Sequence, residues 1–313
     1  MGKYIFKRLV MLIPVVLGIS FVVFSIISLT PGDPAQLILG ESASAEALAN
    51  KREELGLNDP FIVRYLKYVS RVVVGDFGRS YTTNVPVAQE IMSRFPNTLV
   101  LTISAVLLAI LIGIPIGVFT AVRQYSLWDS GIMLLTLLGV SMPVFWLGLM
   151  LILQFSLHWN LLPAVGQPSW SINGVRALVL PTLSLGISTA AIITRMTRSS
   201  MLDVVRQDYI RTARAKGVSE FYVITRHALK NALIPVITVI GIQFGSLLGG
   251  AILTESIFSW PGVGRLLVEA IRQKDTPRVM GIVIFLAIAF SLVNLIVDII
   301  YVYVDPRIRS RYK

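Results

Sequence analysis

Six long apolar stretches, none interrupted by a Lys or Arg residue, constrain the fold of this chain more than any other feature. A helix needs roughly 20 apolar residues to cross a hydrocarbon core about 30 Å thick, because each residue adds about 1.5 Å. The backbone must also satisfy its own hydrogen bonds inside a bilayer. The sequence therefore predicts an all-α integral membrane protein with six transmembrane helices. The stretches cover residues 9–29, 99–122, 131–157, 177–193, 232–254 and 280–304.

The composition excludes several classes of protein. Of the 313 residues, 55% are hydrophobic and only 14% are charged, which argues against a disordered chain and a soluble fold. The absence of cysteine excludes disulfides, thiolate metal sites and cysteine nucleophiles. The two histidines, His158 and His227, offer little for zinc binding or a Ser–His relay. We therefore expect no catalytic residue, no metal and no cofactor bound by this chain.

The N-terminal apolar run follows basic residues, as the core of a signal peptide does. It is 21 residues long, however, and no small-residue cleavage pattern follows it. We therefore expect this run to be retained as the first membrane span.

The distribution of basic residues predicts the orientation of the spans. With six spans, both termini lie on one side, together with the loops 123–130 and 194–231. This side holds sixteen Lys and Arg residues, and the short loops on the other side hold five. Because cytoplasmic loops carry such an excess, we predict a multi-pass protein of a bacterial or archaeal cytoplasmic membrane with both termini cytoplasmic. The net charge of +11 is then a topology signal, and nucleic-acid binding loses its main support.

Three spans carry small residues at every fourth position, and therefore on one helix face. Because membrane helices approach closely at such faces, we expect a tightly packed bundle, with contacts inside the chain or to a homologous partner. Each of the first five spans also contains a proline, which can kink a helix. The small-residue stripes are Ala105-Ala109-Gly113-Gly117-Ala121, Thr182-Gly186-Ala190-Thr194 and Gly241-Gly245-Gly249, and the prolines are Pro14, Pro115, Pro143, Pro181 and Pro235.

Polar residues within the spans are candidates for a transport pathway. Asn294 and Asp298 are four residues apart and share a face of the last span. An acid at this depth suggests either a structural hydrogen bond between helices or a residue that lines a pathway. Gln154 and Gln243 are further pathway candidates.

Residues 30–98 are too numerous for a simple connection and are predicted to form a small helical segment outside the membrane. Asp33 and Asp59 each precede a proline, a pattern typical of helix N-termini. Apolar residues after Asp59 fall on one helix face, and residues 44–56 are predicted to form another short helix. This extracytoplasmic segment is either a scaffold or a docking surface for an external partner.

The loop 194–231 is predicted to fold as a basic helix–turn–helix. Apolar residues have helical spacing over 199–216, Gly217 ends this helix, and a second helix covers 219–229. Small residues at the bend, such as Ala213, would let the surface of another protein approach closely. Both ends of the loop are tethered to spans, which argues against binding to DNA.

The residues of this loop match a known pattern. The first helix and bend read Asp208-Tyr209-Ile210-Arg211-Thr212-Ala213-Arg214-Ala215-Lys216-Gly217, followed by Arg226-His227-Ala228-Leu229 and Asn231-Ala232-Leu233-Ile234-Pro235. They resemble the EAA loop of ABC importer permeases in its peptide-permease form. Arg211 replaces the usual acidic residue and the proline lies further from the glycine, and both departures are typical of the peptide and nickel subfamily.

Short motifs extend this resemblance over almost the whole chain, and their order and spacing match the first permease subunit of dipeptide and oligopeptide importers. The motifs are Thr30-Pro31-Gly32-Asp33-Pro34-Ala35, Gly75-Asp76-Phe77-Gly78, Phe258-Ser259-Trp260-Pro261-Gly262-Val263-Gly264 and Asp305-Pro306-Arg307.

The resemblance implies a type I ABC importer permease fold and one permease domain over residues 1–313. In such importers this subunit forms half of the pathway with a homologous second permease, two ABC ATPase subunits supply power, and an extracytoplasmic peptide-binding protein delivers substrate. The chain has no GxxxxGK[ST] phosphate loop, so ATP would be hydrolysed by the partner subunits. The implied ATPase-coupling residues are Asp208, Tyr209, Arg211, Thr212, Ala213, Arg214, Ala215, Lys216 and Gly217, with mechanical coupling on Thr212, Ala213 and Gly217.

Three other functions are consistent with parts of the sequence. The same machinery could import glutathione or a nickel chelate, because permeases of very similar sequence handle these substrates. An ion-driven secondary transporter would be expected to carry more intramembrane charges than the single Asp298. An intramembrane hydrolase would need a nucleophile and a base within the spans, and neither histidine lies there.

Overall fold

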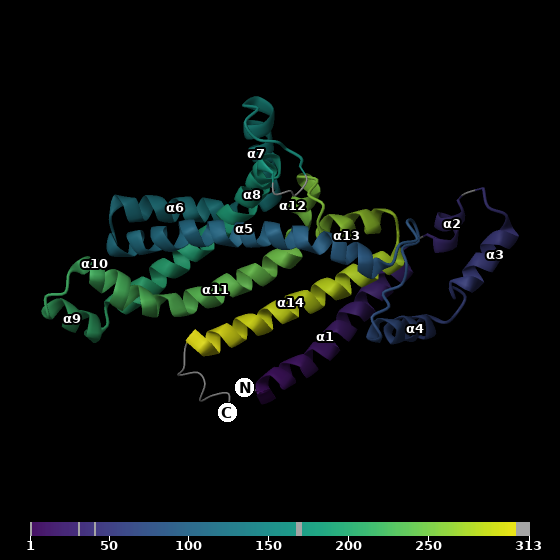
Figure 1. Ribbon diagram of the computed structural model, residues 1–313, viewed down its shortest axis with the longest axis horizontal. Coiled ribbons are helices and arrows are strands. Elements are labelled where there is room, and N and C mark those ends of the chain that lie inside the picture. Colours follow the sequence, from purple (N-terminus) through teal and green to yellow (C-terminus); the bar gives the residue numbers. More distant parts are fainter. Residues whose placement is uncertain (1, 31, 41, 167–170, 305–313) are drawn as a thin grey trace. The chain divides into compact units, whose positions relative to one another are not determined.

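The computed structural model describes residues 2–30, 32–40, 42–166 and 171–304. Within these ranges the chain is helical almost throughout, and the β pairing consists of one isolated bridge between Arg79 and Pro86. The all-α prediction is confirmed. In Figure 1 the α-helices are α1 (Gly2–Leu29), α2 (Pro34–Leu39), α3 (Ala45–Glu54), α4 (Phe61–Val73), α5 (Val87–Val122), α6 (Leu127–Ser141), α7 (Val144–Leu151), α8 (Ile172–Val205), α9 (Asp208–Ala215), α10 (Glu220–Tyr222), α11 (Leu229–Gly250), α12 (Ile252–Ile257), α13 (Val263–Arg272) and α14 (Thr276–Val304), and the π-helical segments are η1 (Ile152–His158) and η2 (Val223–Ala228).

Five of the six predicted spans coincide with helices long and apolar enough to cross a membrane. The third, predicted over 131–157, is not one helix. It is divided into α6 and the continuous pair α7–η1, which are bent by 99° at Met142 and Pro143. Pro143 explains the break, because a proline cannot donate its backbone hydrogen bond and disfavours helical geometry in the residue before it.

The helix ends differ from the predicted span ends. α5 begins at Val87 and α8 extends from Ile172 to Val205, so both are longer than the apolar stretches inside them. The fifth predicted span, 232–254, ends early, because α11 stops at Gly250 and α12 follows as a separate short helix. Hydropathy locates the lipid-spanning part of a helix, whereas the helix continues for as long as its caps and packing allow.

The chain forms two compact units. Unit 1 holds residues 99–260 and the part of α14 from Leu292 onward, and unit 2 holds residues 2–98 and 261–291. The boundaries therefore fall within α5, between α12 and α13, and within α14.

In unit 1, small residues bring α5 and α8 into close contact. A Cβ atom at Gly113 would lie 3.0 Å from the carbonyl oxygen of Ala190, and one at Gly117 would lie 2.7 Å from that of Thr194. A Cβ atom at Gly186 would meet Leu108 on the opposite helix. The first two predicted stripes therefore pack against each other, within the chain.

The third stripe, on α11, behaves differently along its length. Gly241 faces Val297 of α14 so closely that a Cβ atom would clash with the valine side chain. Gly245 is buried, but Gly249 is exposed and has open space where a side chain would lie. This stripe therefore serves packing within the chain at one end only. Among the other prolines named above, Pro14, Pro115, Pro181 and Pro235 all lie within helices.

In unit 2, short capped helices follow α1. The Asp33 carboxylate accepts a hydrogen bond from the backbone of Ala35, as predicted for an N-cap, and Ser44 caps α3 in the same way. Asp59 does not cap α4, contrary to the N-cap pattern. It pairs with Lys67 at 2.6 Å instead, and Pro60 occupies the cap position.

Aromatic contacts hold α4 against α1 in unit 2. Tyr65 packs edge-on to Phe21 at 5.2 Å between ring centroids, and its hydroxyl donates to the carbonyl of Leu17 at 3.0 Å. Phe61 lies 5.3 Å from Phe24. Of the apolar face predicted after Asp59, Tyr65 makes this attachment, whereas Ile62, Leu66 and Val73 are exposed, so the face that packs on the first span is a different one.

A buried polar cluster joins the 80–90 region to the start of α14 within unit 2. The fully buried carboxylate of Asp275 accepts a hydrogen bond from Ser80 at 2.6 Å. Arg278 lies 2.8 Å from Glu90, and its guanidinium donates to Gln273 at 3.0 Å. Pairing these charges offsets the free-energy cost of burying them.

The contact between α5 and α8 generates a prediction. Gly117→Ala should lower the free energy of unfolding by about 1–3 kcal/mol, because its methyl group overlaps Thr194 and Thr197. Gly131→Ala in α6 is the matched control, since nothing lies within 4 Å of its Cβ position and alanine favours a helix. The measurement is thermal unfolding in detergent. Equal midpoints for the two variants would contradict this packing.

Candidate functional site

The loop 194–231 folds as a helical hairpin, seen at the left of Figure 1 where α9 and α10 precede α11. The predicted continuous helix over 199–216 is wrong in one respect, because α8 ends at Val205 and α9 starts at Asp208. Gly217 ends α9 with a φ of 77°, the left-handed geometry expected of a glycine after a helix. The second helix does not stop at Leu229, since α10 runs through η2 directly into α11.

A hydrophobic cluster inside this hairpin fixes the position of α9. Ile210 and Ala213 are the buried residues of α9, and they pack with Met201, Val223 and Ala228 from the flanking helices. Ala213 was expected to offer a small side chain to another protein, but only 9% of its surface is exposed. Its small size instead allows α9 to approach the rest of its own chain.

The opposite face of α9 is exposed. Arg211 pairs with Asp208 at 3.7 Å, and both side chains are largely in contact with solvent, so this pair contributes little. The remaining coupling candidates on this face are exposed and available for a contact outside the chain. They are Thr212, Ala215, Lys216 and Gly217.

Arg214 holds the two sides of the bend together. Its Nη2 donates to Glu220 Oε1 at 2.6 Å and its Nε donates to Oε2 at 3.0 Å, a bidentate pair that joins α9 to α10. The hydrogen bond to Glu220 raises the pKa of the Arg214 guanidinium above its ordinary value. Arg214 therefore has a partner within the chain, whereas the sequence suggested one on another protein.

Sequence reasoning missed an aromatic pair on the same hairpin. Phe221 and Tyr222 are 70% and 54% exposed, and their rings meet edge-on at 5.9 Å. Tyr209, which is also exposed, accepts a hydrogen bond from the side chain of Asn231 at 2.8 Å. The sequence does carry a signal for this pair, since two aromatic residues stand next to each other just after the N-terminus of the second helix.

A second missed feature is the ion pair of Asp129 and Arg198. Both oxygens of the Asp129 carboxylate receive guanidinium hydrogen bonds of 2.6 Å, and one also receives the backbone N–H of Tyr125 at 3.0 Å. This pair fastens the loop 123–130 to the last turns of α8, close to the hairpin. Spatial pairing of residues so far apart in the chain leaves no local pattern in the sequence.

The predicted pathway residues lie on three elements of unit 1. Gln243 on α11 and Asn294 and Asp298 on α14 are half-buried residues of unit 1, and Gln154 is exposed on η1. A contact between Gly241 and Val297 brings these two helices together nearby. The motif Asp305-Pro306-Arg307 and Pro31 lie outside the described residues.

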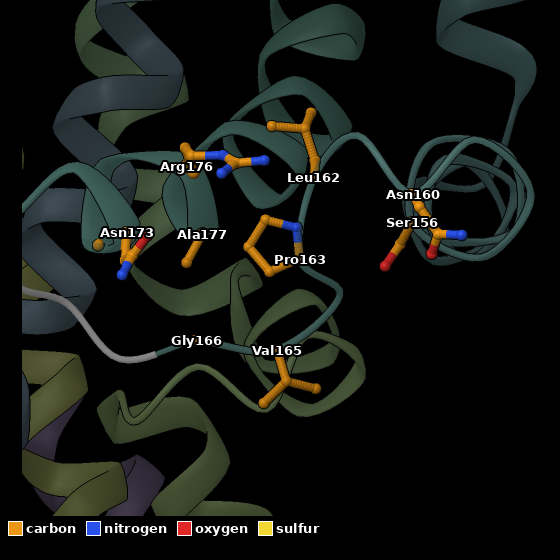
Figure 2. Close-up of a pocket in the computed structure, with 10 residues that line it drawn as sticks. Ser156, Asn160, Leu162, Pro163, Val165, Gly166, Asn173, Arg176 and Ala177 are labelled. Carbon is orange, nitrogen blue, oxygen red and sulfur yellow. The ribbon is translucent and has the colours of Figure 1, made fainter.

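A cavity of about 520 Å³ lies where η1 turns toward α8, and Figure 2 presents its lining. Asn160 and Ser156 lie on one side, and Asn173, Arg176 and Ala177 lie on the first turns of α8. Arg176 donates to the carbonyl of Leu161 at 2.7 Å, which ties the turn to α8. No predicted site residue lines this cavity, and no group of His, Asp and Glu in the described parts of the chain could hold a metal ion.

Family models match nearly the whole chain. The model described as the binding-protein-dependent transport system inner membrane component matches residues 113–310. The model for the N-terminal part of such membrane components matches residues 1–102.

Curated relatives match over 99% of this chain and all of their own length. A dipeptide transport system permease protein, DppB, of Alkalihalophilus pseudofirmus is 48% identical, and the DppB of Escherichia coli is 44% identical. A glutathione transport system permease protein, GsiC, of Salmonella typhi is 45% identical.

A solved chain of the MetNI methionine ABC transporter, in inward-facing conformations, has a similar fold. The TM-score is 0.56 at 17% identity, with 70% of this chain and 97% of that chain covered. A second crystal form gives a TM-score of 0.58 at 18% identity. The predicted type I ABC importer permease fold is confirmed.

The hydrophobic cluster generates a second prediction. Ala213→Leu should destabilise the hairpin by about 1–3 kcal/mol, because the site is closed by Ile210 and Val223. Ala215→Leu, two residues away on the exposed face, should change stability by less than about 0.5 kcal/mol. Amide hydrogen exchange of α9 would measure both effects. Equal exchange rates in the two variants would show that Ala213 is not a packing residue.

Proposed function

Because the chain belongs to the family of binding-protein-dependent transport system inner membrane components, we propose that it is the permease subunit of an ATP-driven importer of di- and oligopeptides. The observation that carries this proposal is the full-length similarity to two dipeptide permeases at 44% and 48% identity. The chain would form half of the translocation pathway and catalyse no reaction itself.

The proposed complex contains a homologous second permease, two ABC ATPase subunits and an extracytoplasmic peptide-binding protein. ATP would be bound by the ATPases, since the sequence here has no phosphate loop. We place both termini and the hairpin of α9 and α10 in the cytoplasm, from the excess of Lys and Arg on that side. Residues 30–98 would then face the binding protein, and residues 1–313 would act as one permease domain.

The exposed face of the hairpin is the proposed contact with an ATPase. Arg211 and Thr212 on α9 and Lys216 at its C-cap would supply polar contacts, and Phe221 and Tyr222 would supply the large aromatic anchors typical of interfaces. The buried face of α9, with Ala213, would pass movement of the ATPase to α8 and α11 as a rigid contact. Arg214 and Glu220 would keep the bend rigid during this movement.

A second substrate, glutathione, is favoured by a relative of 45% identity that carries the name of a glutathione permease. Glutathione is itself a small peptide with free charged termini. We place dipeptides first because the most similar of the relatives compared above is a dipeptide permease.

Reconstitution tests the proposed function. The chain, the second permease, the ATPases and the binding protein would be incorporated in proteoliposomes, with ATP on the ATPase side. Uptake of a radiolabelled dipeptide that requires ATP, the binding protein and this chain is the expected result. Ion-driven uptake by this chain alone would contradict it and favour a secondary transporter.

The aromatic pair generates a functional prediction. Phe221→Ala combined with Tyr222→Ala should reduce uptake at least about tenfold, because loss of two interface anchors typically costs more than 1 kcal/mol each. The folded state should persist, since both side chains are mainly exposed. Trp128→Ala, which removes an exposed aromatic outside the hairpin, is the control. Normal stimulation of the ATPases by the binding protein in the double variant would contradict a coupling role.

A further inference from the structure

A charged cleft lies in the outer segment of unit 2. Its main cavity has a volume of about 530 Å³, and the turn between α3 and α4, one face of α4 and residues 76–78 line it. A smaller cavity of about 300 Å³ shares Leu57, Asn58, Arg64 and Thr276 with it, so the two cavities adjoin. Small-molecule sites commonly have volumes in this range.

Most of the charges around this cleft are already paired. Lys67 pairs with Asp59 at 2.6 Å, and Arg71 pairs with Asp76 at 3.2 Å. Glu54 accepts a hydrogen bond from Lys51 at 2.8 Å. One carboxylate and one guanidinium of the lining, those of Glu53 and Arg64, have no hydrogen bond or ion pair within the described part of the chain. The cleft therefore presents one unpaired negative group and one unpaired positive group.

Besides Arg64, the lining of the cleft holds a second hydrogen-bond donor that has no partner in the described part of the chain, the hydroxyl of Tyr68. Tyr68 lies four residues later on α4 and so on the same helix face, and both line the cavity. The Tyr68 hydroxyl is buried and has no hydrogen-bond partner among the described residues, which is costly unless a ligand satisfies it. Burial raises the pKa of this hydroxyl above its ordinary value, so it stays a donor at neutral pH. Arg64 is held over the ring of Phe24 at 5.7 Å.

We propose that this cleft is a binding site for a short peptide with free termini. The guanidinium of Arg64 and the hydroxyl of Tyr68 donate to the carboxylate of the peptide, and Glu53 accepts from its ammonium group. This assignment rests on the proposed function, in which the chain faces peptides on this side, and it adds a substrate site on the permease itself.

The hollow shape and the two opposite charges favour a small zwitterion over a side chain of a docked protein. An acidic side chain would satisfy Arg64 and Tyr68 but would leave Glu53 unpaired. A peptide of two residues carries both charges, and its side chains can contact Phe24 and Phe77, which also line the cleft. A blocked peptide, which lacks both charges, should therefore bind poorly.

The test measures peptide binding to the purified full-length chain in lipid nanodiscs by isothermal titration calorimetry. The probe is Ala-Phe, and acetyl-Ala-Phe-amide is the blocked control. Arg64→Gln and Glu53→Gln should each raise the Kd at least about tenfold, since hydrogen bonds to charged groups contribute about 1.5–3 kcal/mol. Tyr68→Phe should raise it about threefold or more without a loss of charge. Arg79→Gln, an exposed arginine of the same segment outside the cleft, should leave it unchanged.

Three results would overturn the proposal: no binding of Ala-Phe to the chain, equal binding of the blocked peptide, or equal affinities in the Arg64→Gln and Arg79→Gln variants. Thermal midpoints of the variants would show that each is folded before its affinity is compared. If Arg64→Gln weakens capture of the binding protein while no peptide binds, the occupant is a protein side chain and the proposal fails. Peptide uptake by the complete complex is measured separately, so failure of this site leaves the proposed import function intact.

Discussion

The absence of water in the bilayer core is the constraint on which the rest of this structure depends. Each backbone N–H and C=O group there needs a partner within the chain, so the apolar stretches become helices. Helices in lipid gain little from hydrophobicity against one another, and their association relies on close packing. Gly113, Gly117 and Gly186 supply it, because each allows a backbone to approach a neighbouring helix where a methyl group would clash. The position of α8 against α5 follows from these contacts, and α8 leads directly to the hairpin.

Beyond the apolar part of the helices, the polar segments are held by paired charges and aromatic contacts. Asp129 and Arg198 fasten one loop to α8, Arg214 and Glu220 brace the bend of the hairpin, and in unit 2 the buried Asp275 receives Ser80. Removing one partner of a buried pair leaves a charge that is costly to bury. These ties hold the segments outside the spans to the helices that they contact.

The approximate place of five of the six predicted spans could be predicted from the sequence, because a lipid-facing helix must be apolar whatever its neighbours are. The break at Pro143 was harder to predict, since Pro181 and Pro235 lie inside continuous helices with the same local chemistry. The motif around Ala213 located the hairpin, but which face of α9 is buried depends on contacts with Met201 and Val223. The spacing of apolar residues cannot show which face of α9 is buried, because α9 has only eight residues and the chain is not helical between α8 and α9.

The basic residues of the loop 194–231 fall into two groups, those that pair with carboxylates of the same chain and those that remain exposed. The composition of the loop does not distinguish the two groups. Eight of the chain's basic residues lie in this loop, and two of them, Arg198 and Arg214, are held by carboxylates of the same chain. Those two set the geometry of the hairpin and are not available to a partner. Arg211 has only a long, solvent-exposed pair, and Lys216 projects from the exposed end of the same helix. An exposed pair such as that of Arg211 can be exchanged for another partner at little cost in free energy. Arg211 and Lys216 can therefore contribute both to membrane orientation and to contact with an acidic surface of a partner. Arg198 and Arg214 can contribute only to orientation and to the geometry of the hairpin.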